Sequence, residues 1–204
     1  LYDPEAFGIF AVFVAIATVI ISVSNLQLAE IIVITRDDAD ADAAAGLATA
    51  VVAGLAAVCA LIVLFFANPL ADLLGIQPWA FFLQFLALAV FLGGSRQVVR
   101  RLLLREHRNR HIALGEVSQA IVDRVASIAA FWLAPGTPIG LLVGRLLGQL
   151  AGVLAMLPPL LRRPRNIGLS TAHRQQMRGL ARSYSEFPRY SWAILLDNAA
   201  QQLP

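Results

Sequence analysis

The chain has 204 residues, of which 58% are hydrophobic and only 14% are charged, and its mean hydropathy is +0.71. Ordinary soluble domains carry about 25% charged residues, so this composition excludes a soluble globular protein and indicates a membrane protein. The net charge of +3 does not predict nucleic-acid binding, because the basic residues lie between apolar segments and not on one face of a soluble fold. A single cysteine, Cys59, excludes a disulfide framework within the chain.

Five apolar segments are long enough to cross a bilayer as helices. In chain order they cover residues 7–34, 43–71, 73–95, 112–133 and 139–161. A sixth begins near Tyr190 and reaches Pro204, which is about 22 Å of helix and shorter than the hydrocarbon core of about 30 Å. The segments lack the strict alternation of barrel strands. The sequence therefore predicts an all-α, polytopic membrane helix bundle.

These segments divide the chain into three parts. Residues 1–161 are predicted to form five transmembrane helices of one bundle, and residues 190–204 to form the truncated start of a second bundle. Between them, residues 162–189 contain Arg174, Arg178 and Arg182 at intervals of four. This basic segment is interpreted either as an amphipathic helix held by anionic headgroups or as a solvated linker.

The arginines predict the orientation of the chain. All but two of the 16 basic residues, every one an arginine, follow the first, third or fifth apolar segment, whereas the segment before the first span and the connections 72–78 and 134–138 carry none. By the positive-inside rule, residue 1 is predicted to be periplasmic and at least one further span is expected upstream. The loops predicted to be cytoplasmic cover residues 36–42, 96–111 and 162–189.

The fourth segment carries a polar stripe. Four polar side chains fall within an arc of about 80° on this helix: Glu116, Gln119, Asp123 and Ser127. Arg124 lies at the margin of the stripe. Charges at the centre of a membrane cost at least about 2.5 kcal/mol each, so they normally face a cavity or a partner. The stripe is interpreted as the wall of a water-filled pathway or as a set of charge pairs that staples two helices.

The fifth segment carries a ridge of glycines at every fourth position, which predicts close approach of another helix. These are Gly140, Gly144, Gly148 and Gly152. Arg145 and Gln149 lie one turn apart beside this ridge. The guanidinium of Arg145 suits phosphate oxygens, but it could equally pair with Glu116 or Asp123.

Two further acidic residues, Glu30 and Asp197, lie in the first and the truncated segments. Either could carry a coupling proton if it is buried, or could cap a helix near the interface.

The chain contains no Gly-rich phosphate loop, nucleophile elbow or paired-cysteine site. No catalytic residue, cofactor or metal site is therefore predicted, and the protein is not expected to be an enzyme.

Several stretches resemble the polysaccharide-biosynthesis flippases that move lipid-linked O-antigen or capsule units, within the multidrug/oligosaccharidyl-lipid/polysaccharide exporter superfamily. The opening YDPEAFGIFAVF, the stretch LQLAEIIV from Leu26, the basic segment 105–114 and RSYSEFPRYSWAILLDNAAQQLP from Arg182 are similar to segments of that family. The resemblance implies two six-helix bundles around a central cavity, with alternating access. The span expected upstream of Leu1 agrees with this arrangement.

The resemblance leads to a functional prediction. The intact protein is expected to be a flippase of the bacterial inner membrane whose partners are membrane lipids and an undecaprenyl-diphosphate-linked oligosaccharide. Phosphate would be bound by Arg145, Arg124 and Gln149. The cavity and any coupling H⁺ or Na⁺ would involve Glu116, Gln119, Asp123, Ser127, Glu30 and Asp197. The alternatives are a drug/cation antiporter, a membrane-embedded enzyme of polysaccharide assembly and a scaffold that recruits polymerases.

Overall fold

A computed structural model describes residues 2–24, 32–33, 38–75, 77–133 and 137–161. These residues form helices and short turns, and no strand occurs among them, so the predicted all-α class is confirmed. The predicted linker 162–189, the predicted helix 190–204 with Asp197, and Glu30 lie outside the described residues.

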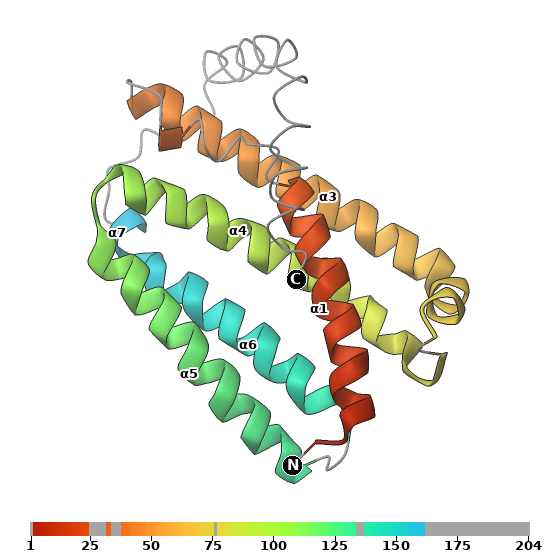
Figure 1. The fold of residues 1–204 in the computed structure, drawn as a ribbon. Helices are drawn as coiled ribbons and strands as arrows, with labels where there is room; N and C mark the ends of the chain where they lie inside the picture. The colour runs from red at the N-terminus through yellow and green to blue at the C-terminus, as the bar shows by residue number, and fades with distance from the viewer. Residues whose placement is uncertain (1, 25–31, 34–37, 76, 134–136, 162–204) are drawn as a thin grey trace, which may run out of the picture.

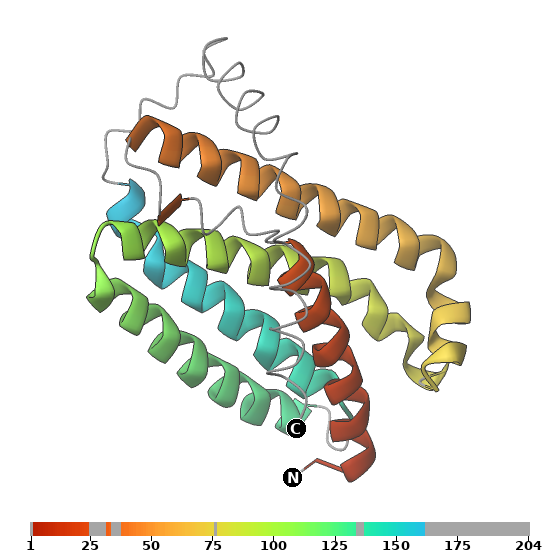
Figure 2. The same ribbon diagram turned by 45° about the horizontal axis from the view of Figure 1, so that its top comes forward.

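The helices form a layer with one helix crossing it. The elements are α1 (Pro4–Ser24), α3 (Asp38–Leu73), η1 (Gln77–Phe85), α4 (Leu86–Arg105), α5 (Asn109–Leu133), α6 (Ile139–Met156) and α7 (Pro158–Leu161). Helices α3, α4, α6 and α5 lie side by side in that order, and α1 crosses over α4 at a steep angle (Figures 1 and 2). The most extensive interface between any two described elements joins α5 to α6.

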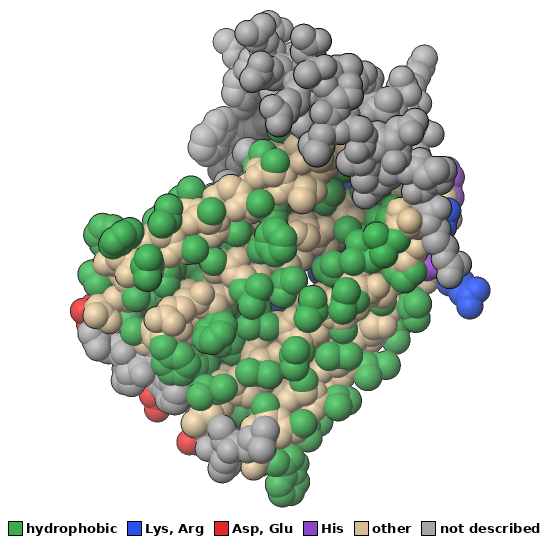
Figure 3. Space-filling model, turned by 180° about the vertical axis from the view of Figure 1, so that it is seen from behind, with side chains coloured by type: hydrophobic (Ala, Val, Ile, Leu, Met, Phe, Trp, Pro, Cys, Tyr) green, Lys and Arg blue, Asp and Glu red, His purple; other side chains and the backbone are tan. Residues whose placement is uncertain are grey.

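Four helical segments are long and apolar enough to cross a membrane: Pro4–Ser22, Ala41–Leu73, Ala80–Arg105 and Ile139–Met156. The chain is therefore a multi-pass membrane protein. Side chains seen from behind are largely apolar, with arginine and histidine gathered at one end and acidic residues at the other (Figure 3). Helix α5 is of similar length, with 25 residues, but it contains Glu116, Asp123 and Arg124. Its crossing of the membrane stays a prediction.

Two predicted segment boundaries are wrong. The third span does not cover 73–95, because α3 runs to Leu73 and α4 continues to Arg105. Accordingly, residues 96–111 are not a loop: α4 ends at Arg105 and α5 begins at Asn109. The physical reason is that Val98 and Leu102 continue the buried face of α4, while arginines occupy its other sides.

The neighbouring boundaries also differ from the predicted ones. The loop predicted over 36–42 is shorter than expected, because α3 begins at Asp38. The fifth span was expected to be continuous over 139–161, but α6 ends at Met156 and the short α7 begins at Pro158. Since a proline has no backbone N–H to donate to the preceding turn, the Pro158–Pro159 pair explains this break.

Helix α3 is bent near its end. With 36 residues it is about 54 Å long, well beyond the hydrocarbon thickness of about 30 Å. Its backbone leaves helical geometry at Phe66, with φ −124° and ψ 18°. Pro69 follows three residues later, where it cannot donate a hydrogen bond to the carbonyl of Phe65. The proline therefore accounts for the kink.

Two apolar clusters hold the bundle together. One joins α1, α3, η1, α4 and α6 through buried residues that include Phe13, Phe82 and Leu142. The second lies at the arginine-rich end and includes Leu103 and Met156. Adjacent glycines in α4 allow close packing: a Cβ atom at Gly93 would meet Ile21 of α1, and one at Gly94 would meet Val52 of α3.

The N-terminal turn is fastened to the end of α5. The hydroxyl of Tyr2 donates a hydrogen bond to the backbone oxygen of Ser127 at 2.6 Å. Its ring makes edge contacts with Phe7 and Phe131, and its hydroxyl fills the space beside Gly140. Tyr2 therefore ties the start of α1 to α5 and α6.

Replacing Tyr2 by phenylalanine is expected to remove this hydrogen bond, retain the ring contacts and destabilise the protein by about 1 kcal/mol. Burial raises the pKa of Tyr2 above its ordinary value of about 10. Because the pKa is higher in the folded state, the stabilisation provided by the protonated Tyr2 hydroxyl is fully present below the ordinary tyrosine pKa. It is lost only as the pH rises through the raised pKa of the folded protein. Thermal unfolding in detergent between pH 7 and pH 9 should show a constant difference between wild type and Tyr2→Phe. Equal midpoints for the two proteins would contradict the role given to the hydroxyl.

Candidate functional site

The glycine ridge of α6 packs directly against the polar stripe of α5. A Cβ atom at Gly144 would lie 2.6 Å from the backbone oxygen of Asp123, and one at Gly148 would lie 2.9 Å from that of Gln119. Gln119 and Ser127 are accordingly buried, with 8% and 6% of their surface exposed. Most of the stripe thus lies in a tight helix interface and does not line an open channel in this conformation.

One ion pair crosses this interface next to the ridge. Arg145 Nη1 of α6 lies 3.8 Å from Asp123 Oδ2 of α5. This distance is beyond that of a direct hydrogen bond, so the two charges attract each other without a fixed donor geometry. The Arg145 side chain is 32% exposed and that of Asp123 is 17% exposed. The arginine is therefore neutralised from one side while its other side stays accessible.

A second, tighter cluster joins α4 to α5. Arg96 Nη1 donates to Glu116 Oε2 at 2.9 Å and also to Gln119 Oε1. Sequence reasoning missed Arg96 because it placed the residue in a loop. The signal was present in the sequence, since Val98 and Leu102 extend the apolar pattern of α4 beyond Ser95.

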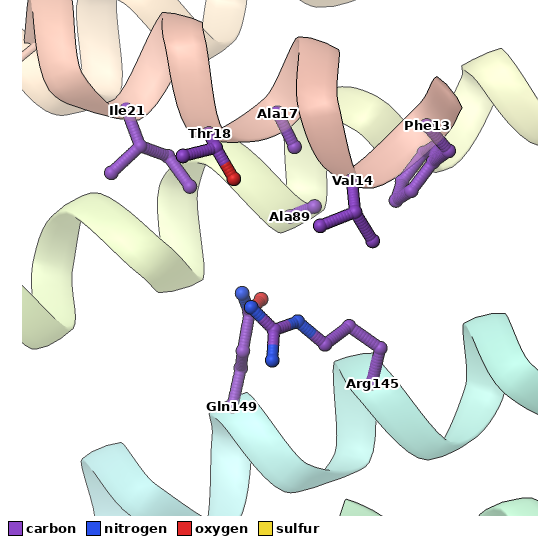
Figure 4. Close-up of a pocket in the computed structure, with 8 residues that line it drawn as sticks. All are labelled: Phe13, Val14, Ala17, Thr18, Ile21, Ala89, Arg145 and Gln149. Atoms are coloured by element: carbon purple, nitrogen blue, oxygen red, sulfur yellow. The ribbon is translucent and has the colours of Figure 1, made fainter. Parts of the chain in front are cut away.

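A small recess lies between α1, α4 and α6. It is lined by Phe13, Val14, Ala17, Thr18, Ile21, Ala89, Arg145 and Gln149. In Figure 4, Arg145 and Gln149 rise one turn apart from α6 toward α1, and the hydroxyl of Thr18 lies on the opposite wall. The recess has room for about one water molecule. Thr18 was not predicted as a site residue, because a lone threonine in an apolar span carries no distinctive signal.

Gln149 differs from Arg145 in its burial. Only 5% of Gln149 is exposed. Its Oε1 atom is buried and has no hydrogen-bond partner among the described residues. Buried polar atoms nearly always have a partner, so this acceptor needs a donor that protein groups in the described part of the chain do not supply.

The structure brings some of the predicted site residues together and separates others. Arg145 and Gln149 share the recess, while Glu116 lies in the Arg96 cluster and Ser127 at the end held by Tyr2. Arg124 is exposed on another side of α5 and does not line the recess. Glu30 and Asp197 lie outside the described residues. Within the described ranges, no group of three acidic, histidine or cysteine side chains could hold a metal ion.

A family model described as "Polysaccharide biosynthesis protein" matches residues 1–185 of the chain. No curated protein and no solved structure matches the chain significantly.

Proposed function

Because the chain belongs to the polysaccharide biosynthesis protein family, we propose that it is a flippase for an undecaprenyl-diphosphate-linked oligosaccharide. It moves this lipid across the bacterial inner membrane by alternating access, with its arginine-rich end in the cytoplasm. In this role it is a transporter and not an enzyme. A coupling ion, H⁺ or Na⁺, would act on carboxylates such as Asp123 and Glu116.

The observation that carries this proposal is the position of Arg145. A diphosphate that crosses a membrane needs cationic groups that replace water, because charges in hydrocarbon are strongly destabilised. The guanidinium of Arg145 offers several donors and remains protonated. It lines the recess between α1, α4 and α6, while its partner Asp123 lies on α5.

The apolar walls of the recess fit the rest of the substrate. Phe13, Val14 and Ile21 of α1 line the recess across from Arg145 (Figure 4), which suits a ligand that joins a charged group to a prenyl chain. The recess holds about one water molecule, so the conformation described here is too narrow for the whole diphosphate. Alternating access supplies the wider state, in which helices around the recess separate.

The recess also favours an anion over the cation of a drug antiporter. Among the described residues that line it, Arg145 carries the one charge. A cationic drug would need a carboxylate in this position, whereas Asp123 lies behind the arginine and pairs with it.

Replacing Arg145 by alanine is expected to lower the rate of lipid-linked oligosaccharide translocation by at least about tenfold, since one lost charge-assisted hydrogen bond costs 1.5–3 kcal/mol. The measurement is transfer of a fluorescent undecaprenyl-diphosphate-linked sugar across vesicles that contain the purified full-length protein.

Arg124→Ala is the matched control, because Arg124 also lies in a long helix but is exposed and outside the recess. We expect this variant to retain most of the activity. Full translocation by Arg145→Ala, in protein with the wild-type unfolding midpoint, would refute the proposed phosphate contact.

A further inference from the structure

The side-chain amide of Gln149 is a candidate for a second contact with the substrate, in addition to Arg145. Gln149 lines the recess, and its Oε1 is a buried acceptor that has no partner among the described residues. A buried amide oxygen without a donor is energetically unfavourable. A ligand that brings one hydrogen-bond donor to this atom therefore gains affinity, whereas a ligand that brings an apolar group does not.

Arg145 and Gln149 both line the recess but differ in solvent exposure. The Arg145 side chain is 32% exposed, whereas Gln149 is 5% exposed. The two residues are one helical turn apart, which is about 5.4 Å along the axis. This spacing allows an anion at Arg145 and a donor at Gln149 to come from neighbouring groups of one ligand.

The size of the recess limits the donor. In the conformation described here it has room for about one water molecule, so a single hydroxyl matches the free space, whereas the phosphate requires the wider state. Ala17 and Ala89 contribute apolar walls, and the hydroxyl of Thr18 is a further polar group in the lining.

We propose that, in the wider conformation supplied by alternating access, the recess recognises the first sugar of the substrate: Arg145 binds the phosphate on the anomeric carbon, and Gln149 Oε1 accepts a hydrogen bond from the hydroxyl on the adjacent carbon. This inference rests on the proposed flippase function and deepens it. It makes Gln149 a specificity-determining residue for lipid diphosphates whose first sugar carries a free hydroxyl next to the phosphate.

The test uses three short-chain probes that bind to the purified full-length protein in nanodiscs. They are farnesyl diphosphate, farnesyl-diphosphoryl-glucose and farnesyl-diphosphoryl-2-deoxyglucose, and the last two differ only in the hydroxyl in question. The dissociation constant of each is measured by calorimetry. Wild type is expected to bind the glucose probe about tenfold more tightly than the 2-deoxy probe.

Two substitutions of Gln149 separate recognition from folding. Gln149→Met has a similar length but lacks the acceptor, so it is expected to bind both sugar probes equally. Gln149→Glu keeps an acceptor oxygen; its negative charge beside Arg145 lowers the affinity for all three probes, but the ratio between the two sugar probes is expected to persist. The unfolding midpoint of each variant shows that it is folded, and the ratio of the two sugar affinities is the readout.

The outcomes distinguish the inference from the proposed function. Equal binding of the two sugar probes by wild type overturns the inference, as does a preference that survives in Gln149→Met. A water that permanently satisfies the amide would produce the first of these results. If farnesyl diphosphate does not bind, or binds equally well to Arg145→Ala, the flippase proposal itself fails.

Discussion

Replacing Gly144 by alanine is expected to destabilise the protein by about 3 kcal/mol, at the upper end of the usual cost of overpacking. A Cβ atom there would collide with Ser127 Oγ and would lie 2.6 Å from the backbone oxygen of Asp123 and 2.9 Å from the backbone nitrogen of Ser127. The hydroxyl can rotate away, but the backbone atoms of α5 cannot. The two helices must therefore separate, which also pulls Arg145 away from Asp123.

Other glycines provide a graded series for this prediction. A Cβ atom at Gly148 would meet Asp123 Cβ at 2.8 Å, whereas the nearest atom at Gly152 is 3.2 Å away and at Gly54 nothing lies within 4 Å. Unfolding by SDS in mixed micelles should show the largest loss for Gly144→Ala, smaller losses for Gly148→Ala and Gly152→Ala, and none for Gly54→Ala. Similar effects at Gly144 and Gly54 would contradict the packing described for α5 and α6.

Charge reversal at Arg96 is the second substitution with a large expected effect. Arg96→Glu places a carboxylate beside Glu116 and removes the donor to Gln119. Breaking a fully buried pair costs 3–5 kcal/mol, but the two side chains are 24% and 43% exposed. Solvent screening reduces the effect, and we expect a destabilisation of about 2 kcal/mol in the same SDS titration.

The matched control exchanges the two charges. The double variant Arg96→Glu with Glu116→Arg restores an attractive pair between α4 and α5, so it should recover at least half of the lost stability. Arg100→Glu, on the same helix but at an exposed position, should change the unfolding midpoint little. Additive losses in the double variant would show that the pair does not join the two helices.

The sequence predicts the polar stripe of α5 and the glycine ridge of α6, because both follow from helical periodicity alone. Whether they meet depends on the rotation of each helix about its axis, which tertiary packing decides. The structure turns Gln119 and Asp123 onto Gly148, so the stripe is mostly interface. The rotation of the two helices also explains why Arg145 and Arg124 lie apart. Each residue lies beside the packing face of its own helix, and the two side chains are on different sides of the interface.

Arg96 shows a second limit of sequence reasoning. The predicted third span ends at Ser95 because Arg96 is the first charged residue that follows its apolar run. The helix continues because its buried face does not include the arginines, and the guanidinium of Arg96 finds a carboxylate on α5. Gly93 and Gly94 were likewise not recognised as contacts, because their neighbours Ile21 and Val52 come from distant parts of the chain.

The composition of α5 has a consequence for biogenesis. The three ionisable residues within its apolar stretch, Glu116, Asp123 and Arg124, make it a poor substrate for lateral release from the translocon as an isolated segment, since each costs about 2.5–3.5 kcal/mol near the middle of a bilayer. Two of these, Glu116 and Asp123, face arginines of α4 and α6. Since α4 precedes α5 and α6 follows it closely in synthesis, the predicted crossing of α5 requires it to enter the lipid together with these neighbours, as part of a three-helix unit that neutralises Glu116 and Asp123.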